Sequence, residues 1–197
     1  MKKYIVIALL VLVGFALYSV GRFYVWKAMD YRDRPWAFSS DESKPLLIGK
    51  WQGSFADPDL VSKKIILEIL NPEPDSVRWE IAFDTQNTSY DHTNWKSRFE
   101  GKALVTSKLG DEHYNVSGLI KGEEGHKFQL FFTSDETKKK VLPNFSLSET
   151  NENASWEGDK MDFQTKFSYY KSDGVLLYQS GDPQHNKVVA VHLERVK

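Results

Sequence analysis

The hydrophobic positions of this chain follow two different patterns, one before and one after residue 46. Residues 4–20, from Tyr4 to Val20, read YIVIALLVLVGFALYSV and contain no charge. From Leu46 onward, apolar and polar residues alternate in short stretches separated by turn residues. A long uncharged run is typical of a membrane-spanning helix, whereas alternation is typical of strands with one buried face. The pattern therefore predicts a helical anchor followed by an all-β domain.

The apolar run predicts a transmembrane helix that contacts the membrane from Tyr4 to Val20. At about 1.5 Å per residue, seventeen residues nearly cross a hydrocarbon core, and Tyr24 and Trp26 suit the aromatic belt at its edge. The alternative is a cleaved signal peptide with two lysines in its n-region. We favour an uncleaved anchor, because the run is long for an h-region and is followed by no good small-residue cleavage site.

Basic residues flank the run on both sides, with two lysines before it and four basic residues within the next fourteen positions. A short basic tail before a first span usually stays in the cytoplasm. We therefore expect an inner (plasma) membrane protein, crossing once, with its domain on the extracytoplasmic side, the periplasm in a bacterium. The expected division is an anchor over residues 1–29, a linker over 30–45 and a domain over 46–197.

The linker sequence, DYRDRPWAFSSDESKP, is polar, contains two prolines and has no period. These features are typical of a connecting segment. Trp36 and Phe38 are its only large aromatic residues besides Tyr31. They could dock on the domain or lie at the membrane interface.

Alternation after residue 46 predicts about nine to ten strands and no helix of three turns. Val77, Trp79, Ile81 and Phe83, for example, alternate with polar or small residues and predict a half-buried strand. Further strands are expected around residues 46–55, 65–70, 98–105, 114–120, 126–133, 145–147, 156–158, 167–169 and 187–196. Short links imply antiparallel neighbours, and hence a meander that closes into a barrel of about eight to ten strands or folds into a sandwich. We favour the barrel, because closure removes exposed strand edges.

Several strands contain a large apolar residue two positions before a glycine, as in Phe99-Glu100-Gly101 and Val116-Ser117-Gly118. Both residues of such a pair lie on the same face of a strand. Glycine at that position lets a strand bend or lets a neighbouring ring lie over the backbone. We interpret this recurrence as a packing device and not as a sequence repeat.

Gly49-Lys50-Trp51 opens the first expected strand, and it resembles the G-x-W signature of the calycins, which include the lipocalins, the fatty-acid-binding proteins and the avidin-like barrels. The resemblance implies that Trp51 closes one end of the barrel and that a basic side chain on the last strand packs across it. Arg195 is the candidate, because it is in phase with Val191 and Leu193. An inward arginine is unfavourable unless it is paired, and a cation–π contact would meet that need.

Composition narrows the possible partners. The chain has 26 basic and 27 acidic residues, and the part after residue 34 carries a net charge of −5. Nucleic acid is not an expected partner, because phosphate binding requires a concentrated basic face. The absence of cysteine excludes disulfides, thiolate metal sites and a cysteine nucleophile.

No catalytic, metal or cofactor site is expected. The five histidines lack metal-ligand spacing, and the sequence contains no P-loop, no G-x-S-x-G and no H-E-x-x-H. We therefore do not expect an enzyme. The candidate ligand-binding residues are aromatic, and the alternative is that they form the core; they are Trp79, Trp95, Trp156, Tyr114 and Phe128.

Two functions follow from these patterns. The first is a membrane-anchored, lipocalin-like module that binds a lipid or other small apolar molecule, with the barrel mouth held near the bilayer. The second is an anchored subunit or immunity-type factor that binds a protein partner, with Trp36, Tyr90 and Trp95 as candidate contact residues. A barrel filled by its own side chains would argue against the first function.

Overall fold

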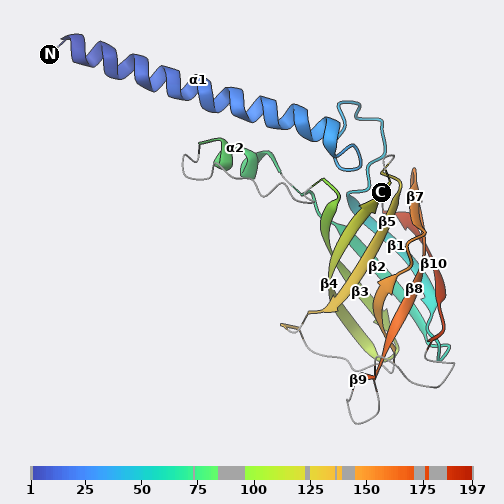
Figure 1. The fold of residues 1–197 in the computed structure, drawn as a ribbon. Helices are drawn as coiled ribbons and strands as arrows, with labels where there is room; N and C mark the ends of the chain where they lie inside the picture. Colours follow the sequence, from blue (N-terminus) through green and yellow to red (C-terminus); the bar gives the residue numbers. More distant parts are fainter. Residues whose placement is uncertain are drawn as a thin grey trace.

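Figure 1 shows a long helix leading away from one end of a β-barrel, with a short second helix beside it. This computed structural model describes residues 2–72, 74–83, 96–122, 125–135, 137–138, 145–170, 176–177 and 186–196. The order of elements is one helix, two strands, the short helix and then eight strands. The fold is mostly β with an N-terminal apolar helix, as the sequence predicts.

Helix α1 (Lys2–Asp33) contains the apolar run. The large apolar side chains from Tyr4 to Leu12 are all more than half exposed. The segment Lys3–Asp33 is long and apolar enough to cross a membrane. The helix continues four residues past the expected anchor boundary at residue 29. The first four residues of the expected linker, 30–33, are therefore helical.

Helix α2 (Asp75–Phe83) replaces the strand that the alternation over residues 77–83 predicts. The strand prediction is wrong because alternating positions also contain two pairs four residues apart, Val77 with Ile81 and Trp79 with Phe83, which lie together on a helix. The two most buried residues of α2 are Arg78 and Ala82, which the strand pattern assigns to the polar face. They face α1, and that packing fixes the helix.

The barrel wall is eight strands around, although ten strands are present among the described residues. Two short strands share one place in the wall, and a third short strand pairs with a longer neighbour. The strands are β1 (Gly49–Ala56), β2 (Ser62–Ile69), β3 (Arg98–Ser107), β4 (Gly110–Lys121), β5 (Lys127–Ser134), β6 (Phe145–Thr150), β7 (Ala154–Glu157), β8 (Lys160–Tyr170), β9 (Leu176–Leu177) and β10 (Val189–Arg195). Consecutive strands from β1 to β5 pair antiparallel, β6 and β7 share one position between β5 and β8, and β9 extends one edge of β8. Strand β10 pairs with both β8 and β1, which closes the barrel.

The barrel interior is the hydrophobic core. Inward side chains of β1, β2, β4 and β5 alternate with exposed ones, and many of those inside have no exposed surface at all. Phe99 illustrates the packing, because its ring lies over Gly118 on the paired strand, where an added Cβ would lie 2.1 Å from the ring. The expected role of such glycines is confirmed at this position.

Because neighbouring strands are antiparallel, each end of the barrel is formed by the starts of some strands and the ends of others. The end nearer the helices, here the proximal end, holds the start of β1 and the ends of β4 and β10 (Figure 1). The opposite, distal end holds the β1–β2 and β3–β4 turns and the start of β10. These two ends are the openings through which a ligand would reach the interior.

Candidate functional site

The proximal end is closed by a contact between the first and last strands. Trp51 and Arg195 are direct partners in the β1–β10 register, and the Arg195 guanidinium lies 4.2 Å from the centre of the Trp51 ring. The guanidinium also donates to the carbonyl of Ile48 (2.9 Å) and of Leu46, and its Nε lies 2.9 Å from Asp159 Oδ1. Trp51 and Arg195 thus have the geometry that the G-x-W resemblance implies.

Trp36 of the linker and Leu47, two residues before β1, fill the same end. Trp36 and Leu47 are almost completely buried in the core, and the Trp36 indole donates to the carbonyl of Lys96 at 3.0 Å. The Trp36 ring lies 5.5 Å from Phe99, and the Leu47 amide donates to the Trp36 carbonyl at 2.8 Å. We call Trp36 and Leu47 the proximal plug. It seals the barrel on the side from which α1 extends.

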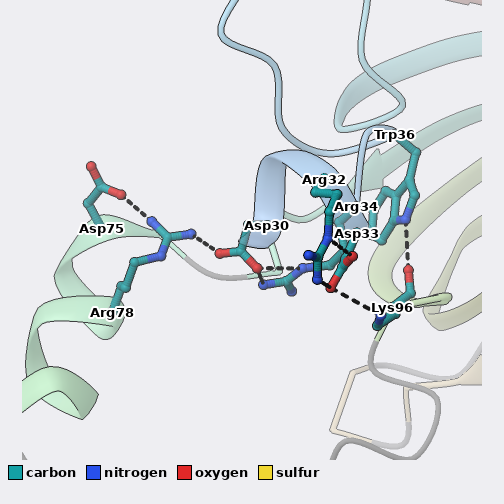
Figure 2. A network of polar contacts seen from close by, with 8 residues as sticks. All are labelled: Asp30, Arg32, Asp33, Arg34, Trp36, Asp75, Arg78 and Lys96. Atoms are coloured by element: carbon teal, nitrogen blue, oxygen red, sulfur yellow. Dashed lines mark hydrogen bonds and ion pairs between the residues drawn. The ribbon is translucent and has the colours of Figure 1, made fainter. Parts of the chain in front are cut away.

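Ion pairs join the two helices just outside the barrel (Figure 2). Asp30 is buried on α1 and accepts from Arg34 through one carboxylate oxygen and from Arg78 of α2 through the other, at 2.5 Å. Arg78 also pairs with Asp75, whose second oxygen lies 2.8 Å from Lys27 Nζ. The Lys27 hydrogen bond is the main reason that the pKa of Asp75 lies below its usual range.

We call the five residues Lys27, Asp30, Arg34, Asp75 and Arg78 the collar. It alternates positive and negative groups, so each buried charge has an opposite neighbour, as burial of charge requires. Figure 2 also shows how the end of α1 meets the barrel, since Asp33 contacts Lys96, 3.1 Å away, beside the Trp36 indole. Collar and plug together hold α1, α2 and the barrel in one arrangement.

A second charged cluster lies inside the distal end of the barrel. Lys63 is 1% exposed and points inward from β2, in phase with Ile65 and Leu67. Its ammonium contacts Glu112 Oε1 at 2.8 Å, the Phe145 carbonyl at 2.7 Å and Asp57 Oδ2 at 3.6 Å. These three acceptors match the three hydrogens of an ammonium group. The lysine side chain therefore occupies the interior where an entering ligand would have to pass.

Tyr114 extends this distal cluster. Its hydroxyl donates to Glu112 Oε2 and accepts from the Leu147 amide at 3.2 Å. Burial, together with the Glu112 charge, raises the pKa of Tyr114 well above its usual range, so the phenol stays neutral. Strands β2, β4 and β6 are thus linked across the interior by polar groups that satisfy one another.

The β1–β2 turn at the distal rim has an unusual residue at its tip. Leu60 is 83% exposed and has φ of 61°, and it is the one non-glycine residue with positive φ among those described. Asp57 shapes the turn, because its carboxylate accepts from the amides of Asp59 (3.0 Å) and Val61 (2.9 Å). Positive φ is an outlier for a bulky residue, and it is adopted only when the surroundings impose it.

A groove of about 480 Å³ near the proximal end is lined by residues from the end of β4, the start of β5 and strand β7. Lys121, Lys127, Ser155 and Trp156 are among the residues that line it. Trp156 is nonetheless 4% exposed, and its indole donates to the Gly125 carbonyl at 3.0 Å. The lining also includes His126 and Glu157, so most of its side chains are polar or charged.

The predicted ligand-binding residues do not form one site. Phe128 and Tyr114 lie in the barrel core, at opposite ends of the interior, and Trp156 lies at the proximal rim. Trp79 is outside the barrel on α2, stacked on Phe23 with ring centres 3.9 Å apart. Trp95 lies outside the described residues.

Sequence reasoning missed the distal cluster, although two signals were present. Lys63 and Glu112 each occupy an inward position in an alternating stretch, where a charge is unfavourable without a partner.

No group of three or more histidine or acidic side chains that could hold a metal occurs within the described ranges. Comparison with protein-family models and with curated proteins found no match.

Proposed function

We propose that this protein is a membrane-anchored, non-enzymatic binding module that binds a protein partner through its distal rim. Helix α1 is the anchor, and the barrel is held on the extracytoplasmic side of the plasma membrane. The collar and the plug make the anchor and barrel one body, so the distal rim points away from the bilayer. This arrangement suits the presentation of a surface to another protein.

Leu60 carries this proposal. It combines two unfavourable features in one residue, the exposure of a large apolar side chain and a left-handed backbone conformation in which glycine or asparagine is ordinarily found. The turn that Asp57 shapes imposes the backbone conformation, in which the Leu60 amide donates to the Asp57 carbonyl at 2.8 Å, but the Leu60 side chain is left exposed. The exposure is explained if a partner covers the Leu60 side chain, and strained residues gather at functional sites.

The filled interior supports a protein partner over an apolar ligand inside the barrel. The proximal plug blocks the end that faces the membrane, and the Lys63 ammonium with its carboxylates occupies the other end. An apolar molecule entering there would strip these charges of their partners. The lipocalin-like alternative, a lipid or small apolar ligand, would have to use the external groove beside Trp156, whose volume is in the range of small-molecule sites but whose side chains are mostly polar or charged.

The test is site-specific photocrosslinking in cells that make the full-length protein. A photoreactive amino acid at position 60 should give one discrete protein adduct. The same group at position 66, on the outer barrel wall and 36% exposed, is the matched control and should give none. Equal adducts from both positions, or none from position 60, would contradict the proposal.

Native mass spectrometry of the detergent-purified protein separates the alternative. We expect the mass of the bare chain. A stoichiometric lipid or other apolar molecule, lost on substitution of Trp156 by alanine, would support the small-ligand function instead.

A further inference from the structure

Helix α2 packs along α1, and its C-terminal end reaches the apolar run. The rings of Phe83 and Phe15 are 6.3 Å apart, and Trp79 stacks on Phe23 eight residues further along α1. Asp75 pairs with Lys27, still further along. The two helices are therefore antiparallel, and α2 runs from the collar toward the N-terminal part of α1, as Figure 1 shows.

The depth of α2 follows from the helix rise. Phe15 lies five residues before Val20, the last residue of the uncharged run, which corresponds to about 7–8 Å at 1.5 Å per residue. If residues 4–20 span the hydrocarbon, Phe83 lies at the same depth as Phe15. Interfacial amphipathic helices bury their apolar side chains about 5–10 Å into the headgroup and acyl boundary.

Helix α2 is charged in its N-terminal part and apolar at its C-terminal end, as expected if only the C-terminal end reaches the lipid. Its charged residues, Asp75, Arg78 and Glu80, all lie within the first six positions. Its last three residues are Ile81, Ala82 and Phe83. Phe83 is 46% exposed despite its contact with α1. An end that is apolar and half-exposed suits contact with lipid.

The contact between the helices is of the kind found in membranes. Ser19 of α1 and Ala82 of α2 are both fully buried, and small side chains let two helices approach closely in lipid. The buried charges of the collar are Asp30 near the end of α1, Arg34 just after that end, and Arg78 in the first half of α2. Asp30 lies ten residues past the uncharged run. Hydrophilic and apolar parts of the pair are thus separated along the membrane normal.

We propose that the C-terminal end of α2 enters the bilayer interface beside α1, so that the protein contacts the membrane with two helices and not one. The partner of this surface is the lipid at the boundary between headgroups and acyl chains. The inference rests on the proposed membrane anchor, and it goes beyond it, because a single span would leave α2 in water.

The absence of cysteine permits a direct test with single spin labels. Full-length variants carrying F83C or I81C are reconstituted in nanodiscs of phosphatidylcholine and phosphatidylglycerol. Collisions of the label with oxygen, which partitions into lipid, are compared with collisions with a water-soluble nickel chelate. L12C on α1 and L109C at the β3–β4 turn are the references for lipid and water.

We expect nickel accessibility at position 83 to be several-fold lower than at position 109, with oxygen accessibility nearer to that of position 12. Position 81 should show the same shift, which protects the test against local disturbance by one label. If positions 81 and 83 match position 109 while position 12 is in lipid, the inference fails and the anchor stands. If position 12 also behaves as water-exposed, the anchor fails as well.

Discussion

The side chain of Lys63 shows how one residue organises the distal end of the barrel. A lysine that is 1% exposed has lost its hydration, and its three contacts replace the water that it gave up. Asp57 belongs to the turn that holds Leu60, so the cluster connects the barrel interior to the distal rim. The conformation of the proposed binding turn therefore depends on a buried ion pair beneath it.

Replacement of Lys63 by methionine should lower the free energy of unfolding by about 3–5 kcal/mol, because Glu112 keeps a buried charge without its partner. The measurement is denaturant unfolding of the detergent-solubilised chain, followed by tryptophan fluorescence. The matched control is K64M, an exposed neighbour on β2, which should stay within about 0.5 kcal/mol of the parent.

The double variant K63M/E112Q should be more stable than K63M alone, because it removes one of the two buried carboxylates, Glu112 and Asp57, that lose Lys63 as a partner. If K63M and K64M have the same free energy of unfolding, the cluster has no structural role.

At the level of elements, α2 depends on its contacts with α1. Nine residues are too few for a stable isolated helix in water. Packing of Trp79 on Phe23 and the ion pairs of Arg78 with Asp30 and of Asp75 with Lys27 supply the missing stability. We therefore expect α2 to be helical only while it packs against α1.

The substitution R78M should detach α2, because it removes the central cation of the collar and leaves Asp30 with one cationic partner fewer. Hydrogen exchange of the full-length protein in nanodiscs measures the effect, and protection of the α2 amides should fall to near the level of an unstructured peptide. E80Q, an exposed change on the same helix, should leave protection unaltered. Unchanged protection in R78M would show that apolar packing alone retains the helix.

For the whole molecule, the decisive contact is the one that closes the barrel. Arg195 joins the last strand to the first through Trp51 and through the carbonyls of Leu46 and Ile48. These carbonyls lie next to the plug, so barrel closure and docking of the linker are coupled. The barrel, the plug and the helices are held in one arrangement by contacts at a single end.

The variant R195M should destabilise the protein by about 2–4 kcal/mol, because it removes the cation–π contact and leaves backbone carbonyls without a donor. E194Q is the neighbouring control on β10. In a double-mutant cycle with W51F, the two changes should be non-additive by roughly 0.5–3 kcal/mol, as expected for residues in contact. Strict additivity in thermal unfolding would contradict the proposed closure.

Local patterns along the chain predict much of this architecture. The uncharged run predicts α1, and the alternation predicts most of the strands, because each pattern reflects the period of one element and the side on which it is buried. The position of Arg195 on the inward face of the last strand predicts a partner, because an inward charge is unfavourable alone. Gly49-Lys50-Trp51 identifies that partner through a resemblance.

Contacts between distant segments decided the rest. Alternation over residues 77–83 fits a strand and a helix equally, and only burial of Arg78 against Asp30, 48 residues away, selects the helix. The same holds for Trp36, whose burial required the open end of a finished barrel, and for Lys63, whose carboxylate partner is 49 residues distant. A local sequence period indicates which side of an element is buried. It does not indicate which residues cover that side, because those residues come from distant parts of the chain and meet the element only when the chain folds.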